Sequence, residues 1–204
     1  TNRGGEAVWA RDRGSGDSRL AHRSPARTAI GQDRAIALHA AVVAPAELLT
    51  SLYGEQHRLC PTPNPQLSLV LSHEREIDLI ELEQLCDSVG WSRRPLRRVR
   101  KALQHSLLRV GLWRHDPRLP KLVGFARCTG DGVVEATVWD VAVHPLYQGA
   151  GLGKQLMVYV LDQLRTMEVD RVSLFADPEV VAFYAAQGWE LEPLQRRCAF
   201  WYAP

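Results

Sequence analysis

The segment from residue 138 to 157 has the residue types and spacing of an anion-binding turn. Gly149, Gly151 and Gly153 follow an apolar run, residues 138–143, whose β-branched side chains favour a buried strand. After the glycines, apolar residues recur at helical spacing. The first N–H groups of such a helix lack intrahelical partners, and the helix dipole favours negative charge there. The pattern of strand, glycine turn and helix therefore predicts a cradle for an anionic group.

The spacing of these glycines excludes two common nucleotide-binding motifs. A Walker A loop requires a glycine and a Ser or Thr at positions that Gln148 and Gln155 occupy here. A dinucleotide fingerprint that starts at Gly149 requires a third glycine where this sequence has Lys154. The turn is therefore unlike that of a nucleotide triphosphatase or a dinucleotide-binding dehydrogenase.

The pattern that fits is Q/R-x-x-G-x-G/A, formed by Gln148, Gly151 and Gly153. It resembles the coenzyme A pyrophosphate loop of the GNAT acyltransferase superfamily. A simple linking turn is the alternative, but residues 175–189, FADPEVVAFYAAQGW, resemble the second GNAT signature and follow at the right distance. The resemblance implies that acetyl-CoA contacts Val141, Ala142, Val143, Gln148, Gly149, Ala150, Gly151, Leu152, Gly153 and Lys154.

Longer segments narrow the resemblance. Residues 123–157, residues 172–189 and the closing FWY of residues 200–202 look like the GNAT subfamily of cyanobacteria and plastids. Its plant members are described as serotonin (arylalkylamine) N-acetyltransferases and as plastid protein acetyltransferases acting on lysines and N-termini. The resemblance covers residues 66–202 and implies acetyl transfer to a primary amine by direct attack in a ternary complex. It does not choose the amine.

This chemistry requires a base, because an alkylamine with a pKa near ~10.4 is almost entirely protonated at neutral pH. Asp140 interrupts the apolar central strand, where a buried carboxylate is costly without a purpose or a partner. We expect Asp140 to accept the proton, directly or through water; the alternative is an ion pair with a neighbouring strand or an arginine. Many GNAT enzymes carry their acidic group three residues earlier, at what is here Thr137, so Glu135 is the second candidate.

The resemblance also implies roles for four further residues. Tyr184 occupies the position of the tyrosine that protonates the leaving thiolate, and a purely packed aromatic fits Phe183 better. Asp177 either caps the following helix or accompanies the catalytic site. Trp139 either forms a wall for the amine or fills the core, and the Val141 N–H could stabilise the oxyanion.

His144 and metal ions are not expected to take part in the reaction. His144 stands just before the proline turn, where loop geometry is its expected role rather than base catalysis. The sequence has no H-x-x-x-H, no paired cysteines and no DxDxDG motif, so no metal is expected.

Composition sets limits on compartment and partners. The 204 residues carry a formal net charge of +2, and no apolar run reaches the roughly 18 residues of a membrane span, so neither nucleic acid nor membrane is an expected partner. Cys60, Cys86, Cys128 and Cys198 are scattered, as is usual for reduced thiols. We expect a cytoplasmic monomer or homodimer, or a protein of the plastid stroma if its Arg- and Ser-rich N-terminal segment is a transit peptide.

The chain divides at a proline-rich linker near residue 65. Residues 1–65 are expected to be an extension, disordered to about residue 33 and loosely helical over residues 35–52. Residues 66–204 are the expected GNAT domain, of α/β (α+β) class, with a mixed, mostly antiparallel sheet flanked by helices. The predicted strands cover residues 66–72, 106–113, 121–128, 138–143, 171–175 and 198–202, and the predicted helices residues 78–89, 95–105, 152–167 and 178–187.

The predicted helix at residues 95–105 adjoins a strongly basic run, residues 93–101. Such a run is usually a solvated face; the alternative is a docking surface for an acidic partner or RNA. A second function class therefore stays open: a non-catalytic acyl-CoA-binding or partner-docking module that uses this basic face.

Overall fold

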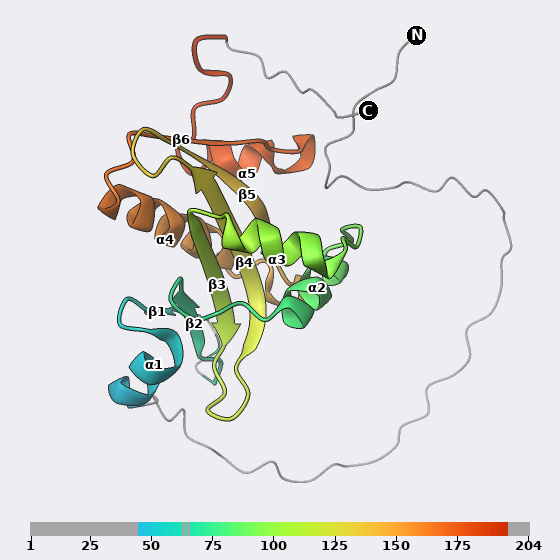
Figure 1. Cartoon of the computed structure of the whole chain (residues 1–204), viewed down its shortest axis with the longest axis vertical. Coiled ribbons are helices and arrows are strands. Elements are labelled where there is room, and N and C mark those ends of the chain that lie inside the picture. The colour runs from blue at the N-terminus through green and yellow to red at the C-terminus, as the bar shows by residue number, and fades with distance from the viewer. Residues whose placement is uncertain (1–44, 63, 65, 196–204) are drawn as a thin grey trace, which may run out of the picture.

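The computed structural model describes residues 45–62, 64 and 66–195, which form one six-stranded sheet with helices on both faces (Figure 1). The strands are β1 (Arg58–Cys60), β2 (Leu69–Ser72), β3 (Leu108–Arg114), β4 (Lys121–Gly130), β5 (Glu135–Val143) and β6 (Arg171–Leu174). The helices are α1 (Ala46–Tyr53), α2 (Leu79–Ser88), α3 (Leu96–Gln104), α4 (Leu152–Thr166) and α5 (Val181–Ala185), with short 3-10 turns η1 (Pro145–Tyr147), η2 (Pro178–Val180) and η3 (Pro193–Gln195).

The strands lie in the sheet in their chain order, β1 to β6. The pairs from β1 to β5 are antiparallel, and β5 and β6 are parallel. The parallel pair arises because α4 carries the chain back along the sheet between the two strands. The predicted mixed, mostly antiparallel sheet is confirmed.

Both faces of the sheet are covered, which explains why strand β2 is buried at every position. Leu69 and Leu71 contact the core that includes the apolar side of α4. Val70 points the other way and packs with Leu82 and Leu85 of α2. Helices α1, α2 and α3 thus share one face, and α4 covers the opposite one (Figure 1).

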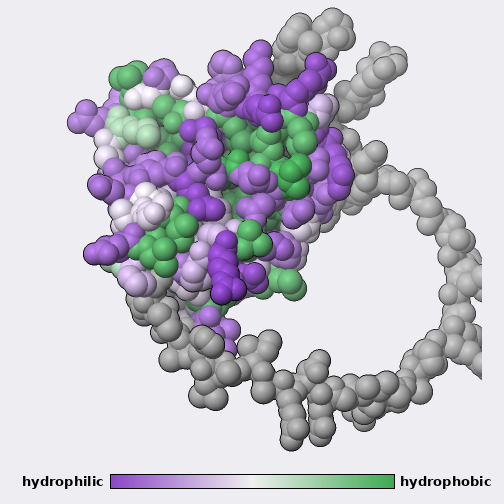
Figure 2. All heavy atoms as spheres, turned by 60° about the horizontal axis from the view of Figure 1, so that its bottom comes forward, coloured by the Kyte–Doolittle hydropathy of each residue, from purple (hydrophilic) through white to green (hydrophobic). Residues whose placement is uncertain are grey.

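Local sequence signals explain where α2 and α3 begin. The Asp78 carboxylate accepts hydrogen bonds from the N–H groups of Ile80 and Glu81 at 2.8 and 2.9 Å, so Asp78 caps the helix that was predicted to begin at residue 78. Pro95 precedes the first residue of α3, where a missing N–H costs nothing. On the part of the surface drawn in Figure 2, hydrophilic side chains border patches of hydrophobic surface.

The first part of the sheet lies before the predicted boundary at residue 65. Strand β1 pairs with β2, and Tyr53 of α1 is fully buried in the core that α1, α2 and α3 share with one face of the sheet. Residues 46–60 therefore pack with the domain, and the boundary falls inside the packed unit. The three prolines of residues 61–65 connect two paired strands, β1 and β2, instead of two separate regions.

Other predicted elements differ in extent. The predicted helix over residues 178–187 is a 3-10 turn, η2, followed by the short helix α5. The predicted disordered segment, most of the predicted helix over residues 35–52 and the predicted strand over residues 198–202 lie outside the described residues. Within the ranges that the structure describes, no helix combines the length and apolar character that a membrane span requires.

Candidate functional site

Strand β5 contains a β-bulge at Asp140. In the pairing with β4, Phe125 lies opposite Ala142 and Arg127 lies opposite Trp139, so Asp140 and Val141 together face a single residue. Asp140 has a φ of 55°, which is uncommon for a residue with a side chain. A bulge re-aims the side chains that follow it and is frequent beside active sites.

The bulge places the Asp140 carboxylate against an arginine. Its Oδ2 accepts a hydrogen bond from Nε of Arg127, and the two side chains are only 8 % and 12 % exposed. The expected alternative, an ion pair with an arginine of the neighbouring strand, is thus confirmed. The second oxygen, Oδ1, is buried and has no hydrogen-bond partner among the described residues. The carboxylate can therefore hold Arg127 with one oxygen and accept a proton or hydrogen bond with the other.

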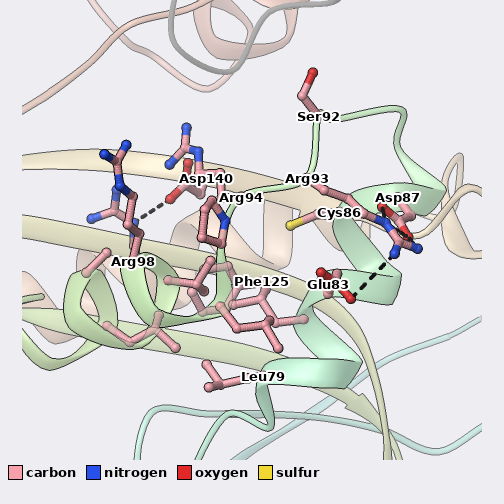
Figure 3. Close-up of a pocket in the computed structure, with 17 residues that line it drawn as sticks. Leu79, Glu83, Cys86, Asp87, Ser92, Arg93, Arg94, Arg98, Phe125 and Asp140 are labelled. Atoms are coloured by element: carbon pink, nitrogen blue, oxygen red, sulfur yellow. Dashed lines mark hydrogen bonds and ion pairs between the residues drawn. The ribbon is translucent and has the colours of Figure 1, made fainter.

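A cavity of about 450 Å³ opens between α2, α3 and the sheet, with Asp140 in its wall (Figure 3). Leu79, Leu82 and Phe125 supply apolar surface. Arg94 and Arg98 lie at the Asp140 end, and Glu83, Asp87 and Arg93 gather at the other end (Figure 3). The cavity thus combines an apolar interior with a buried carboxylate, which suits an amine attached to an apolar group.

Arg94 differs from its neighbours on the basic run. Its side chain lines the cavity, and burial lowers its pKa to about 10, an effect that the nearby Asp140 carboxylate opposes. The sequence interpretation placed Arg94 on a solvated face and left out Arg127. The sequence did contain a signal for this ion pair. Arg127 is a cation inside the apolar strand that precedes the strand of Asp140, and a buried carboxylate is expected to have such a partner.

Among the described residues, β5 has no strand partner on its outer edge beyond Val138. The pairing of β5 with β6 ends at Val138 and Leu174. The N–H of His144 donates to the Val123 carbonyl of β4 at 2.8 Å. Since N–H groups alternate along a strand, those of Val143 and Val141 point to the opposite, open edge, whereas that of Ala142 points toward β4. Val141 and Val143 thus offer two spaced donors to an extended ligand.

The glycine turn supplies further open backbone. Gly149 and Gly151 have φ angles of 79° and 74°, and a Cβ added at either would meet nothing within 4 Å. Gly151 precedes α4 and gives it no side-chain cap, so the first N–H groups of the helix stay available for a ligand. The turn is fixed by Gln148, whose Nε2 donates to the Val143 carbonyl at 2.7 Å. This geometry suits the predicted anion cradle.

The other predicted contacts of the cradle differ in exposure. Leu152 is buried, and Ala150 packs against the same core, so only their backbone atoms can reach a ligand. Gly153 lies against Phe183, whose Cζ would be 3.3 Å from an added Cβ. Lys154 is exposed and can approach an anion with its side chain.

Tyr184 lies on the α4 side of the sheet, opposite the Asp140 cavity. It is 7 % exposed and packs edge-on against Phe183 and Trp189, at ring centroid distances of 5.0 and 6.1 Å. Burial raises the pKa of its phenol, and the Asp177 carboxylate raises it further. The expectation that Phe183 is the better packed aromatic was wrong, because Phe183 is 37 % exposed. Asp177 precedes η2, but its side chain makes no capping hydrogen bond, so the alternative that Asp177 caps this helix was wrong. Its carboxylate is instead near enough to Tyr184 to affect the pKa of the phenol.

Trp139 and Glu135 lie outside the cavity lining. The Trp139 indole donates to the Thr129 hydroxyl at 2.8 Å, and its ring centroid is 5.4 Å from that of Phe175. Glu135 is 57 % exposed and forms an ion pair with Arg171. The position three residues before Asp140 holds Thr137, whose hydroxyl bonds to Ser173 at 3.0 Å. Asp140 is therefore the carboxylate that the geometry favours.

His144 contributes to the turn. Its Nδ1 accepts a hydrogen bond from the Leu146 N–H at 3.2 Å, which supports the expected role in loop geometry. Among the residues described, no three His, Cys, Asp or Glu side chains group in a way that could hold a metal ion.

Comparison with known proteins gives consistent matches. The sequence profile of the Acetyltransferase (GNAT) family matches residues 77–189. An uncharacterized ycf52-like N-acetyltransferase of Prochlorococcus marinus is 62% identical over 152 residues, which is 74% of this chain and 84% of that protein. Serotonin N-acetyltransferase 2, chloroplastic, of Oryza sativa subsp. japonica is 39% identical over 120 residues, covering 57% of this chain and 58% of that protein. A solved GNAT family acetyltransferase of Streptococcus pneumoniae TIGR4 superimposes with a TM-score of 0.55 at 26% identity, over 68% of this chain and 98% of that one.

Proposed function

Because the chain belongs to the Acetyltransferase (GNAT) family, whose members use acetyl-CoA, we propose that it acetylates a primary amine that enters the cavity beside Asp140. The acceptor is an arylalkylamine such as serotonin, or a lysine or N-terminal amine of a protein. One observation carries the proposal above the others. A buried carboxylate, Asp140, lies in the cavity wall with one oxygen that has no hydrogen-bond partner among the described residues, two residues beyond the last β5–β6 pair.

The backbone of β5 and the glycine turn holds acetyl-CoA in this proposal. The pyrophosphate lies against the turn of residues 148–153, where the first N–H groups of α4 and the positive end of its dipole favour anions. The pantetheine arm extends along the open edge of β5 and accepts hydrogen bonds from the N–H groups of Val141 and Val143. Ala142 contributes packing only, because its side chain is buried on the other face.

Asp140 serves as the base. The incoming ammonium donates a hydrogen bond to Oδ1, and the carboxylate then takes the proton, directly or through one water. The free amine attacks the thioester carbonyl, and the Val141 N–H stabilises the oxyanion. A C–N bond forms and the C–S bond breaks in one ternary complex, without a covalent enzyme intermediate.

Tyr184 serves as the acid on the other side of the strand edge. It donates its phenol proton to the departing thiolate, and the second proton that the nitrogen loses on becoming an amide restores the phenol through solvent, while Asp140 releases the first proton to solvent. A phenol is already protonated at neutral pH, and burial and the Asp177 carboxylate both raise the pKa of Tyr184 further. The proposed role of Asp177 is to lie beside Tyr184 and disfavour its phenolate. Asp140 and Tyr184 lie on opposite faces of the sheet, so one proton leaves the amine on one side and a different proton reaches the sulfur from the other.

The proposed site for the amine combines the cavity with the part of β5 that lies beyond its pairing with β6. The apolar lining of the cavity fits the ring of an arylalkylamine, and Trp139 remains a proposed contact because it precedes Asp140 at the free edge. The compartment is the cytoplasm or the plastid stroma. The rice relative is named as chloroplastic, which supports the plastid stroma, and the free cysteines Cys60, Cys86 and Cys128 suit either compartment.

The test is acetyl-CoA turnover, followed as thiol release, with tryptamine or serotonin, a lysine peptide and an N-terminal peptide. We expect turnover with at least one of them and its loss in Asp140→Asn. Asp162→Asn is the matched control, since Asp162 also pairs with arginines but lies on the surface of α4. Coenzyme A binding without turnover on any amine would favour the non-catalytic module instead.

A further inference from the structure

Basic residues are concentrated in one part of this nearly neutral chain. The formal net charge is +2, yet residues 88–115 contain eight Arg or Lys and no Asp or Glu. The eight are Arg93, Arg94, Arg97, Arg98, Arg100, Lys101, Arg109 and Arg114. Six of them lie in or just before α3, which therefore creates a strong local positive potential.

The structure divides the six residues in or just before α3 into two groups. Arg93 pairs with Asp87 at 2.5 Å and with Glu83 at 3.9 Å, and Arg94 and Arg98 line the cavity. Arg97, Arg100 and Lys101 form the second group, which we call the cationic face; all three are exposed, and no ion pair is found for them within the described residues. Helix α3 buries only Leu103 fully, so it presents this face outward.

We propose that the cationic face of α3 docks an acidic polypeptide segment whose lysine or N-terminal amine enters the cavity. The proposal rests on the proposed acetyltransferase function. Arg94 and Arg98 connect the face with the cavity, so a bound chain can run from one to the other. A small amine that fills about 450 Å³ would not reach Arg97, Arg100 or Lys101, because none of them lines the cavity.

Charge and position favour an acidic polypeptide over coenzyme A and over a nucleic acid as the partner of the cationic face. Coenzyme A is anionic, but its predicted cradle begins α4, which covers the sheet face opposite to α3. The bases of a nucleic acid carry no alkyl amine, so a nucleic acid would not deliver the nucleophile that the cavity is proposed to receive. A polypeptide with acidic residues near its amine supplies both the nucleophile and the complementary charge.

The experiment compares two lysine peptides of equal length, one with Asp and Glu beside the lysine and one with Arg at those positions. Wild type, the variant R97E/R100E/K101E and the control R114E/R118E/K121E are assayed for kcat/KM, with tryptamine as a small acceptor. The control reverses three exposed charges at the β3–β4 hairpin, the end of the sheet away from α3 (Figure 1). We expect wild type to prefer the acidic peptide by at least about tenfold at low salt, an effect typical of electrostatic steering.

The α3 variant should lose this preference and keep its tryptamine turnover, whereas the control should keep both. High salt should reduce the preference in wild type. Turnover with tryptamine or peptides but without any preference for acidic neighbours would overturn this inference alone. A raised KM for acetyl-CoA in the α3 variant would assign the face to coenzyme A, and salt-sensitive RNA binding lost in that variant, without a peptide preference, would assign it to nucleic acid. Absence of turnover with every amine would instead refute the proposed function.

Discussion

Arg127 of β4 and Asp140 of β5 form an ion pair across the two strands at the point where β5 bulges. Both side chains are almost fully buried, so neither charge is solvated by water in the way a surface pair is. The bulge aims Asp140 at the cavity, and Arg127 offsets the cost of burying its charge. The pair therefore links the stability of the sheet to the position of the proposed base.

Removal of one partner of the Arg127–Asp140 pair should destabilise the fold by more than the whole ion pair contributes to stability. Arg127→Ala should lower the free energy of unfolding by about 3–5 kcal/mol, because it leaves a buried carboxylate without a counter-charge. The double variant Arg127→Ala/Asp140→Ala should lose less than the sum of the single variants. Urea denaturation measures the free energy of unfolding of wild type and of each variant. Arg171→Ala is the control: its pair with Glu135 is exposed, so we expect a loss of about 0–1 kcal/mol. Equal losses in both arginine variants would contradict the buried-pair interpretation.

Tyr184→Phe tests the proposed acid. Turnover should fall by about 10²-fold, a usual contribution of general acid catalysis, while acetyl-CoA affinity stays the same. The matched control is Tyr159→Phe, another buried tyrosine, whose hydroxyl donates to the Gln56 carbonyl at 2.5 Å. It should cost about 1–3 kcal/mol of stability, because the Gln56 carbonyl loses its donor, and leave turnover intact. Unchanged turnover in Tyr184→Phe would remove Tyr184 from the mechanism.

Asp177→Asn should lower the pKa of Tyr184. The Asp177 carboxylate disfavours the phenolate, so the loss of its charge makes ionisation easier, although burial still holds the pKa of Tyr184 above 10.0. Labelling of the tyrosine Cζ with ¹³C and titration by NMR would follow this group. A raised folded-state pKa also means that Tyr184 contributes stability below pH 10, and that this contribution is lost as the pH rises toward the folded-state pKa. A pKa of Tyr184 that does not move in Asp177→Asn would show that Asp177 acts in another way.

The sequence predicted the elements whose signals are local. The helix that begins at residue 78 and the succession of strand, glycine turn and helix around Gly151 depend on residues close together in the chain, and the structure confirms these elements. Strand β1 was missed because three residues are too few for a periodic pattern, and the prolines after it resemble a linker. The role of Arg127 depends on the register of β4 against a bulged β5, which periodicity does not reveal. The sequence showed that Asp140 was unusual, but only the folded structure could show that Arg127 is its partner.

Two histidines should make the fold sensitive to acid. Burial lowers the pKa of both His73 and His115. The Tyr159 hydroxyl gives its proton to Gln56, so His73 donates to Tyr159 through Nδ1, at 3.0 Å. A depressed pKa contributes stability that is fully present above the ordinary value of about 6.5 and is lost as the pH falls through the folded-state value. Urea midpoints measured from neutral to mildly acidic pH should fall, and should fall less in His73→Gln/His115→Gln. An equally steep decline in that variant would assign the acid sensitivity to other groups.

Gly151→Ala separates backbone strain from the loss of anion binding. At a φ of 74° an alanine costs roughly 1–2 kcal/mol, so the variant should be less stable. If the first N–H groups of α4 hold the pyrophosphate, displacement of this residue should also raise the KM for acetyl-CoA. Gly90→Ala provides the match: Gly90 has a φ of 79° and equally open surroundings, but follows α2 on the other face of the sheet. It should lose similar stability and keep the wild-type KM. A raised KM in both variants would mean that general destabilisation, rather than the geometry of the glycine turn, controls acetyl-CoA binding.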